Sequence, residues 1–346
     1  MTNVTLKKFA VFLLPLLLYI VAEQLWGVWV AVALSALLPM AFIVRYLVNG
    51  KGNVAHHISD LVLIALFALI ELLPCPYAVC FALMGILLIL SGMRVISLFK
   101  IMGISDSVWA RNPYAVANMQ SAQRRMGVWC ILGATLFAVS YAYFPQTDIA
   151  QWTDNWGLFA IILCSVATEI LVGRINYYRY RNAEWVPLVS EDGKVVGQCP
   201  RPLVHNGSLW LHPVVHLHVL SQGKLLLQLR PLTKKIQPGK WDTAVGGHIA
   251  AGETIEKALG REVWEEIGLR NFEAKLLKTY TWQSTVEHEY VFSFITNADG
   301  PFITKNIGEV DELRFWSKEE LVNNIGKDVF TLNLEKELVQ LILPNI

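Results

Sequence analysis

Three glutamates lie within five residues of one another in the segment REVWEEIGL, residues 261–269. Glu262 and Glu266 are four residues apart, and Glu265 is three from Glu262, so on a helix all three carboxylates share one face. Mg²⁺ and Mn²⁺ prefer oxygen ligands of this kind, and they also bridge to substrate phosphates. The alternative is a solvated acidic face, because glutamate is mostly exposed in folded proteins.

The residues around these glutamates follow a longer pattern of fixed spacing. Its members are Gly247, Glu253, Arg261, Glu262, Glu265, Glu266 and Gly268, followed by the aliphatic Leu269. This pattern resembles a complete Nudix box, and the resemblance covers roughly residues 185–345. It implies a Nudix sandwich fold and hydrolysis of a diphosphate linked to another group. It also implies that the three glutamates bind Mg²⁺ or Mn²⁺ and orient the attacking water. Arg261 is expected to hold its helix through an ion pair.

Histidines and glutamates elsewhere in this half indicate a second metal site. His205 and His212 are seven residues apart, His248 follows the box glycine, and Glu287 and Glu289 share one face of a strand. Each alone fits a surface or core position, but together they resemble the metal ligands of the isopentenyl-diphosphate isomerases, a Nudix branch. The resemblance implies a second Mn²⁺ or Zn²⁺ ion.

The same resemblance assigns three basic residues to a substrate diphosphate, namely Arg201, Arg230 and Lys234. The sequence departs from the isomerase pattern at two positions. Gln237 stands where the isomerases have a tryptophan, and Gly246 stands where they have the catalytic cysteine. Glycine cannot transfer a proton, and the box has its hydrolytic form, so diphosphate hydrolysis is the favoured activity.

Two other functions remain open. The chain could be an isomerase that uses another base, or a ligand-sensing Nudix module that regulates a transporter or channel. The substrate could be a nucleoside diphosphate derivative, or a prenyl or lipid diphosphate. His216 and His218 alternate with apolar residues, and we interpret them as structural.

The elements that must position these residues are those of an α/β sandwich with a mixed sheet. Alternation predicts hairpins over 185–198 and 213–230, a strand over 241–247, and further strands over 273–282, 289–296 and 311–316. Helices are predicted over 253–267, 317–325 and 332–343. Ser317 and Glu320 match a capping box for the second of these.

The first half predicts an all-α bundle of six transmembrane helices. Apolar runs recur at residues 9–25, 28–48, 59–73, 77–98, 127–145 and 156–173. All twelve Lys and Arg of residues 1–181 lie before the first run, in or at the edges of the second–third and fourth–fifth gaps, or after the sixth run. That asymmetry predicts a multi-pass protein of the plasma (inner) membrane with both termini in the cytoplasm. A buried bundle in a soluble protein, and a signal peptide over residues 1–25, are the alternatives.

The resulting domains are a membrane domain over 1–181 and a cytoplasmic Nudix domain over 182–346. No long basic run is present, so nucleic-acid binding is not expected. Glu169 lies inside the sixth run, where it is either functional or a hydrogen-bonded structural group. Cys75 and Cys80 could pair only in an oxidising compartment.

Overall fold

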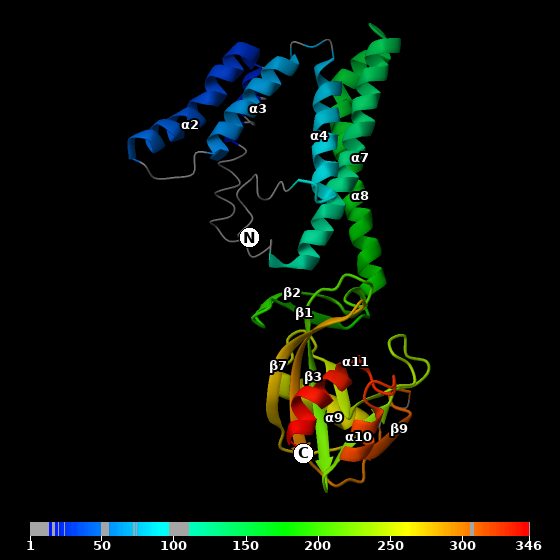
Figure 1. The fold of residues 1–346 in the computed structure, drawn as a ribbon. Helices are drawn as coiled ribbons and strands as arrows, with labels where there is room; N and C mark the ends of the chain where they lie inside the picture. The colour runs from blue at the N-terminus through cyan, green and yellow to red at the C-terminus, as the bar shows by residue number, and fades with distance from the viewer. Residues whose placement is uncertain are drawn as a thin grey trace. The chain divides into compact units, whose positions relative to one another are not determined.

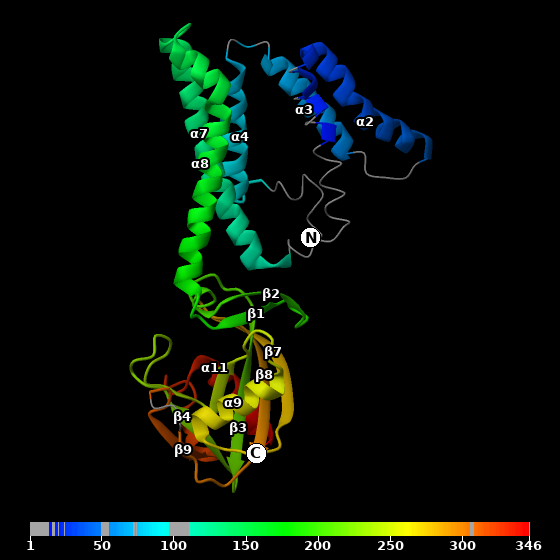
Figure 2. The same ribbon diagram turned by 180° about the vertical axis from the view of Figure 1, so that it is seen from behind.

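The computed structural model describes residues 14–15, 18–19, 21–23, 25–49, 55–71, 73, 75–96, 111–304 and 308–345. The chain divides into two compact units (Figures 1 and 2). One contains Met1–Arg111 and Ala115–Arg179, and the other contains Asn112–Tyr114 and Tyr180–Ile346. The three residues Asn112–Tyr114 thus belong with the second unit, because Tyr114 packs against the apolar cluster of Val186 and Leu188.

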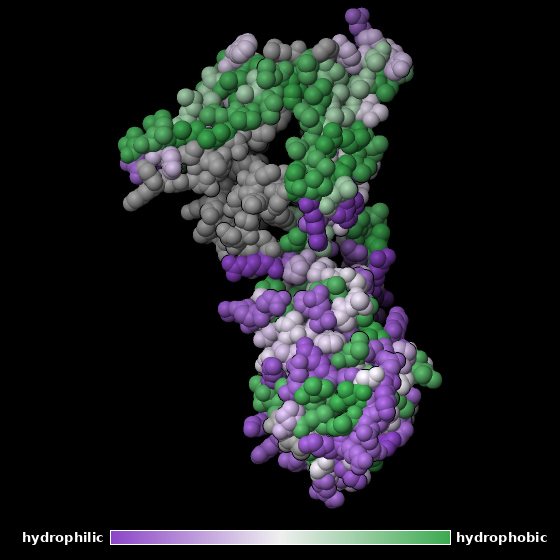
Figure 3. Space-filling model, in the orientation of Figure 1, coloured by the Kyte–Doolittle hydropathy of each residue, from purple (hydrophilic) through white to green (hydrophobic). Residues whose placement is uncertain are grey.

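The first unit is helical. Its described helices are α2 (Val28–Asn49), α3 (Ala55–Glu71), α4 (Pro76–Gly92), α7 (Pro113–Tyr143) and α8 (Asp148–Tyr180). Three of them, α2, α7 and α8, are long and apolar enough to cross a membrane, and α4 is a shorter apolar helix. Apolar side chains cover much of the helical surface, whereas polar side chains predominate on the second unit (Figure 3).

Five of the six predicted apolar runs lie on these helices, and the first run falls largely outside the described residues. The fifth run differs most from its prediction, because α7 begins at Pro113 and so includes the polar segment before residue 127. The structure therefore shows a helical region with three long apolar helices, and a six-helix bundle is not shown.

Glycines allow α4 and α7 to approach closely. A Cβ atom on Gly85 would lie 2.9 Å from the carbonyl oxygen of Gly127, and one on Gly127 would lie 2.8 Å from that of Gly85. Small residues at reciprocal positions are typical of helix pairs in membranes, where close packing replaces the hydrophobic effect.

Glu169 is paired with Arg125 across α7 and α8. The Arg125 Nε and Nη2 atoms each donate to a different carboxylate oxygen of Glu169, both at 2.7 Å. A bidentate ion pair of this kind neutralises both charges in a fixed geometry. It favours the structural interpretation of Glu169 over the functional one. Cys75 and Cys80 carry free thiols.

The second unit is built around a mixed sheet in the order β5-β4-β3-β8-β7, with β6 pairing with β3 and β9 pairing with β4. These strands are β3 (His212–Ser221), β4 (Lys224–Leu229), β5 (Trp241–Thr243), β6 (Val245–His248), β7 (Lys275–Gln283), β8 (His288–Asn297) and β9 (Glu312–Ser317). A separate antiparallel pair, β1 (Trp185–Val189) and β2 (Val195–Pro200), lies beside them. The central pair β3–β8 is parallel.

Helices cover both faces of this sheet. Helix α9 (Ile255–Ile267) packs on one face, where Val263 and Ile267 meet Val215 and Leu217 of β3. Helices α10 (Lys318–Asn324) and α11 (Leu332–Glu337), with the π-helical turn Leu338–Ile342, pack on the other through Leu321, Leu334 and Leu338. The even-numbered residues His212–His218 of β3 point away from the α9 face, because side chains alternate along a strand.

The α/β prediction is confirmed for this unit, and each predicted strand and helix overlaps an observed one. The capping box at the start of α10 is present with both of its hydrogen bonds. The predicted strand over 241–247 is two short strands, β5 and β6. The predicted closing helix is divided in the structure. Its first part is α11, which ends at Glu337, and the following residues form the π-helical turn.

Candidate active site

Helix α9 has a defined start and end. The Thr254 side chain accepts a hydrogen bond from the Lys257 N–H, which caps the N-terminus. Gly268 ends the helix in the left-handed region, with a φ of 67° that glycine adopts at no steric cost. The last turn therefore presents Glu262, Glu265 and Glu266 in a fixed orientation.

Arg261 ties this helix to the loop before it. Its Nε and Nη2 atoms donate to the two carboxylate oxygens of Glu253, both at 3.0 Å, and Nη2 also donates to the His248 carbonyl oxygen at 3.0 Å. Nη1 donates to Glu262 at 2.7 Å. The hydrogen bonds between Arg261 and Glu253 are the main cause that raises the pKa of Arg261 and lowers the pKa of Glu253. Both groups therefore stay charged, and Arg261 has the anchoring geometry expected of it.

The box glycine lies directly against Glu262. A Cβ atom on Gly247 would lie 2.0 Å from the Glu262 carboxylate carbon, so no larger residue fits without displacing that carboxylate. The Glu262 side chain is only 13% exposed, and burial raises its pKa. Gly247 and Arg261 together fix where this carboxylate lies.

Glu266 is the buried member of the three glutamates. Its Oε2 atom accepts hydrogen bonds from the Gly246 N–H at 3.0 Å and from the Gln228 amide at 3.1 Å. Burial raises its pKa to about 8. Glu265 differs, because its side chain is 40% exposed and its carboxylate lies 3.7 Å from Arg261. The three predicted carboxylates thus lie on the same helix but differ in their burial and partners. Of the three, Glu266 lines the cavity described below.

Three of the predicted metal ligands meet at one point. One nitrogen from each of His205, His212 and His248 lies within 4.8 Å of the others. The His205 and His248 Nε2 atoms are 2.9 Å apart, and the His212 and His248 rings are stacked with centroids 5.2 Å apart. These residues come from the loop after β2, from β3 and from β6.

The protonation of these imidazoles suits a metal ion. The His212 Nδ1 atom lies 2.9 Å from the Trp210 carbonyl oxygen, which can only accept, so Nδ1 carries the proton and Nε2 has a free lone pair. That Nε2 atom is buried and has no hydrogen-bond partner in the part of the chain that the structure describes. Burial lowers the pKa of His212 to about 4 and that of His248 well below its usual value. Neutral, converging imidazoles are the donor set that divalent transition metals prefer.

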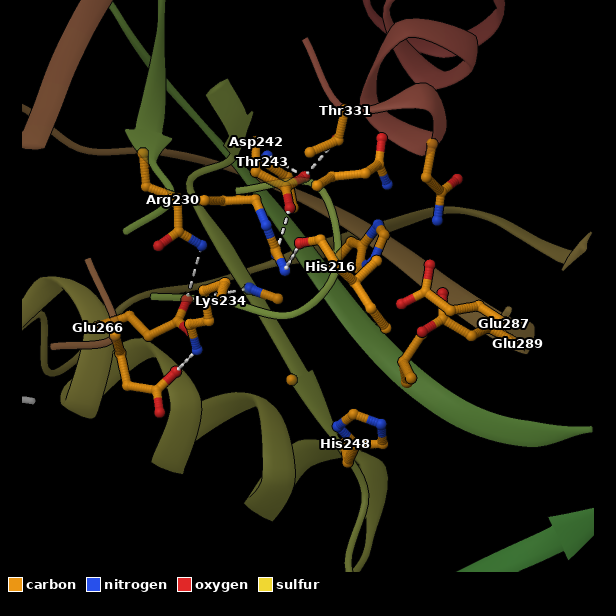
Figure 4. Close-up of a pocket in the computed structure, with 18 of the residues that line it drawn as sticks. His216, Arg230, Lys234, Asp242, Thr243, His248, Glu266, Glu287, Glu289 and Thr331 are labelled. Atoms are coloured by element: carbon orange, nitrogen blue, oxygen red, sulfur yellow. Dashed lines mark hydrogen bonds and ion pairs between the residues drawn. The ribbon is translucent and has the colours of Figure 1, made fainter. Parts of the chain in front are cut away.

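A cavity of about 300 Å³ connects the histidines to the acidic helix (Figure 4). Its lining includes His205, His248, Glu266, Glu287 and Glu289. Glu289 lies directly across from His212 in the β3–β8 register. Burial raises the pKa of Glu289 to about 8, and the neighbouring Glu287 adds to this. Glu287 and Glu289 therefore share a cavity with two of the histidines, although the compact ligand cluster itself contains the three histidines.

Basic residues line the same cavity. They are Arg201, Arg230, Lys234 and Lys235, and the first three are those predicted to hold a diphosphate. Each of the three already has an acidic partner. Arg201 donates to Glu184 at 2.9 Å, Arg230 donates to Asp242 at 2.8 Å, and Lys234 pairs with Glu309. The pairs hold the cationic groups in position at the cavity wall.

Some cavity residues were not predicted from the sequence. Asp242, Thr331 and Asn333 line it, and the Thr331 hydroxyl donates to Asp242 at 2.8 Å. No local spacing links them, because they come from β5 and from the start of α11. His216 also lines the cavity, which differs from its interpretation as a purely structural residue. Cys199 lies elsewhere, in the buried cluster with Val186 and Leu188, where burial raises its pKa to about 12.

A cavity on a mixed sheet, lined by converging histidines and bordered by an acidic helix, is typical of a small-molecule site. Residues 210–334 match the family model for the NUDIX domain. The chain is 30% identical over 149 residues to an isopentenyl-diphosphate Delta-isomerase of Clavibacter michiganensis subsp. michiganensis, covering 41% of this chain and 76% of that protein. The chain therefore belongs to the NUDIX family through its C-terminal domain.

Other relatives carry both isomerase and hydrolase names. An isopentenyl-diphosphate Delta-isomerase of Mycolicibacterium vanbaalenii is 36% identical over 88 residues, covering 25% of this chain and 49% of the relative. An uncharacterised Nudix hydrolase of Pseudomonas aeruginosa is 29% identical over 134 residues, covering 39% of this chain and 79% of the relative. The chain thus spans about half the length of the first of these two relatives.

Proposed function

We propose that this chain is a membrane-anchored Nudix hydrolase that cleaves a diphosphate linkage with Mg²⁺ or Mn²⁺. The observation that carries the proposal is the composition of one cavity. It is lined by Glu266 of the intact box, by four basic side chains and by Gly246, which stands, by the family resemblance, where the isomerases have their cysteine. The cavity can therefore bind a diphosphate next to a box carboxylate, without a thiol at that position to move a proton to carbon.

Glu262, Glu265 and Glu266 would hold the ion, and His205, His212, His248, Glu287 and Glu289 would hold a second one, Mn²⁺ or Zn²⁺. A divalent ion, when bound, supplies charge neutralisation for the diphosphate and a bound water of lowered pKa. The chain's own part is to place these groups. Arg261 and Gly247 fix Glu262, the Gly246 N–H orients Glu266, and the basic residues orient the phosphates.

The lining favours one of the two predicted substrate classes. Among the described residues that line the cavity, the only rings are those of histidines, so no Phe, Tyr or Trp offers a stacking surface for a nucleobase. A prenyl or lipid diphosphate has no base to stack, so it needs no such surface. A bilayer next to the domain would supply a substrate of this class. We therefore place lipid-linked or prenyl diphosphates ahead of nucleoside diphosphate derivatives.

The test uses the full-length chain in detergent micelles with a panel of prenyl, lipid, sugar-nucleotide and nucleoside diphosphates. We expect release of phosphate or a monophosphate only when divalent metal is added. Glu265→Gln should abolish turnover. Glu256→Gln, on the exposed first turn of the same helix, is the matched control and should retain it. Full activity in Glu265→Gln would refute this assignment of the site.

Isomerisation is the second candidate, because named isomerases are among the relatives and the three-histidine cluster is present. It predicts an allylic product from isopentenyl diphosphate with no phosphate released, which one NMR time course distinguishes. Metal-dependent nucleotide binding without any turnover would instead favour the ligand-sensing module.

The membrane placement is also a proposal. The three long apolar helices support a multi-pass protein, and the positions of the basic residues support cytoplasmic termini. A fluorescent protein fused to the C-terminus should fluoresce, whereas alkaline phosphatase fused after Trp152 should be active. The reverse pattern would contradict the topology.

A further inference from the structure

One histidine faces the cavity without belonging to the imidazole cluster or to the box. His216 lies four residues after His212 on β3, so both side chains point from the same face of the strand. Figure 4 shows its ring in the cavity that Glu287, Glu289 and the pair Arg230–Asp242 also line. Its position is therefore next to any ligand that the cavity binds.

A buried carboxylate forms a hydrogen bond with the Nδ1 edge of this ring. The His216 Nδ1 atom lies 3.0 Å from Oε2 of Glu337, the last residue of α11, whose side chain is 1% exposed. The His218 Nε2 atom lies 3.2 Å from the same oxygen. Since a carboxylate oxygen accepts, His216 donates through Nδ1, and its orientation is fixed by a residue 121 positions away.

The other edge of the ring faces open space. Gly246 is the direct partner of His216 in the β3–β6 register, and paired residues point their side chains to the same side. A Cβ atom on Gly246 would lie 3.9 Å from the His216 Nε2 atom, so the missing side chain leaves that atom uncovered. Among the described residues, none is recorded as a hydrogen-bond partner of Nε2.

The charges around His216 favour its protonated form. Burial lowers the pKa of His216, but Glu337, through its charge and its hydrogen bond, leads the effects that outweigh burial and raise the pKa to about 9. Burial raises the pKa of Glu337, but the two histidines hold it well below its usual value. The pair is thus an imidazolium and a carboxylate, and Nε2 carries a proton that it can share.

We propose that the Nε2–H of His216, positioned by Glu337, donates a hydrogen bond to a phosphate oxygen of the ligand in this cavity. The inference rests on the proposed function for the chemistry of the ligand, a diphosphate, and adds a contact that the box and the imidazole cluster do not supply. His216 would recognise phosphate from the side of the sheet opposite α9.

The experiment measures binding of methylenediphosphonate, which cannot be hydrolysed, to the full-length chain in detergent with Mg²⁺ by calorimetry. His216→Asn keeps a donor at the Nδ1 position for Glu337 but has no atom at the Nε2 position. His216→Gln keeps a donor at the Nε2 position. We expect His216→Asn to weaken binding about 10- to 100-fold, as for loss of a charge-assisted contact, and His216→Gln to weaken it less.

Glu337 has a matched control on its own helix. Glu335→Gln removes a carboxylate that accepts a hydrogen bond from the Gly326 N–H in the surface loop, and it should bind like the unsubstituted chain. Glu337→Gln should weaken binding, because the imidazolium loses its partner. Equal affinity of His216→Asn and the unsubstituted chain would overturn the inference, and so would failure of the unsubstituted chain to bind.

A second measurement detects the contact in the unsubstituted chain. In the unsubstituted chain with ¹⁵N-labelled histidine, methylenediphosphonate should shift the Nε2 resonance of His216, assigned by its loss in His216→Gln. An unchanged resonance at saturating ligand would overturn the contact. Binding of this probe without phosphate release from any diphosphate would instead refute the proposed hydrolysis and leave the His216 contact supported.

Discussion

Replacing Gly247 with alanine places a methyl group where the Glu262 carboxylate lies. The added Cβ atom would be 2.0 Å from the Glu262 Cδ atom and 2.2 Å from its Oε1 atom. The carboxylate has to move, and in doing so it leaves Arg261, which donates to it at 2.7 Å. Gly247 has no positive φ, so the effect of alanine is steric and not a backbone strain.

The size of the effect follows from this crowding. Overpacking of a buried site costs about 1–3 kcal/mol of unfolding free energy. For a domain of this size, each kcal/mol lowers the Tm by about 2–4 °C, so a fall of about 2–12 °C is expected. Displacing a catalytic group by about 1 Å costs about 100-fold in rate. Gly247→Ala should therefore lose about 100-fold in rate, which corresponds to about 2.7 kcal/mol of transition-state stabilisation, together with this fall in Tm.

The neighbouring glycine is the matched control for stability. A Cβ atom on Gly246 would meet Thr243 Cγ2 at 3.5 Å and His216 Cδ2 at 3.7 Å, which are ordinary contacts. Thermal unfolding of the two full-length variants in detergent, with phosphate release from the best substrate, makes the comparison. If Gly247→Ala had the Tm of Gly246→Ala and the kcat/KM of the unsubstituted chain, the steric argument for Glu262 would be wrong.

Three further predictions concern other groups. The raised pKa of His216, about 9 against an ordinary 6.5, means that its contribution to stability is complete below pH 6.5 and is lost as the pH rises to 9. His216→Gln should therefore flatten this part of the Tm–pH profile, and an unchanged profile would contradict the pair with Glu337. His212→Ala should lower the metal retained after dialysis, measured by mass spectrometry, and equal metal content would exclude His212 as a ligand. Arg125→Leu, which removes the partner of Glu169 from a pair that is about one third exposed, should cost about 1 kcal/mol. The double replacement by leucine should cost less, which a double-mutant cycle in detergent checks, and additive losses would count against coupling.

Local patterns in the sequence predicted the elements of the α/β unit well. The hairpin turning at Ser221–Gly223 follows from two apolar runs separated by turn residues, and it is present as β3 and β4. The capping box at Ser317 depends on residues three apart, which is also a local property. Such features are decided within a few residues, so the sequence alone is enough to find them.

The site depends on contacts between residues that are far apart in the sequence, and no local periodicity predicts such contacts. One of the donors to the Asp242 carboxylate, Thr331, lies 89 residues away, and the partner of His216 lies 121 residues away. His216 and His218 alternate with apolar residues, which indicates a strand but cannot say that one of them lines a cavity and the other does not. Helix periodicity likewise put three glutamates on one face, but their different burial depends on how α9 packs on the sheet.

The empty position at Gly246 makes the cavity open to covalent chemistry by a single substitution. Gly246→Cys would bring a sulfur atom next to the His216 imidazolium, and a neighbouring cation of this kind stabilises a thiolate and lowers the pKa of the thiol. The native thiol of this domain, Cys199, has the opposite property, because burial raises its pKa to about 12. An alkylating reagent would therefore modify the engineered residue in preference to Cys199, and a diphosphate bound in front of it would protect it.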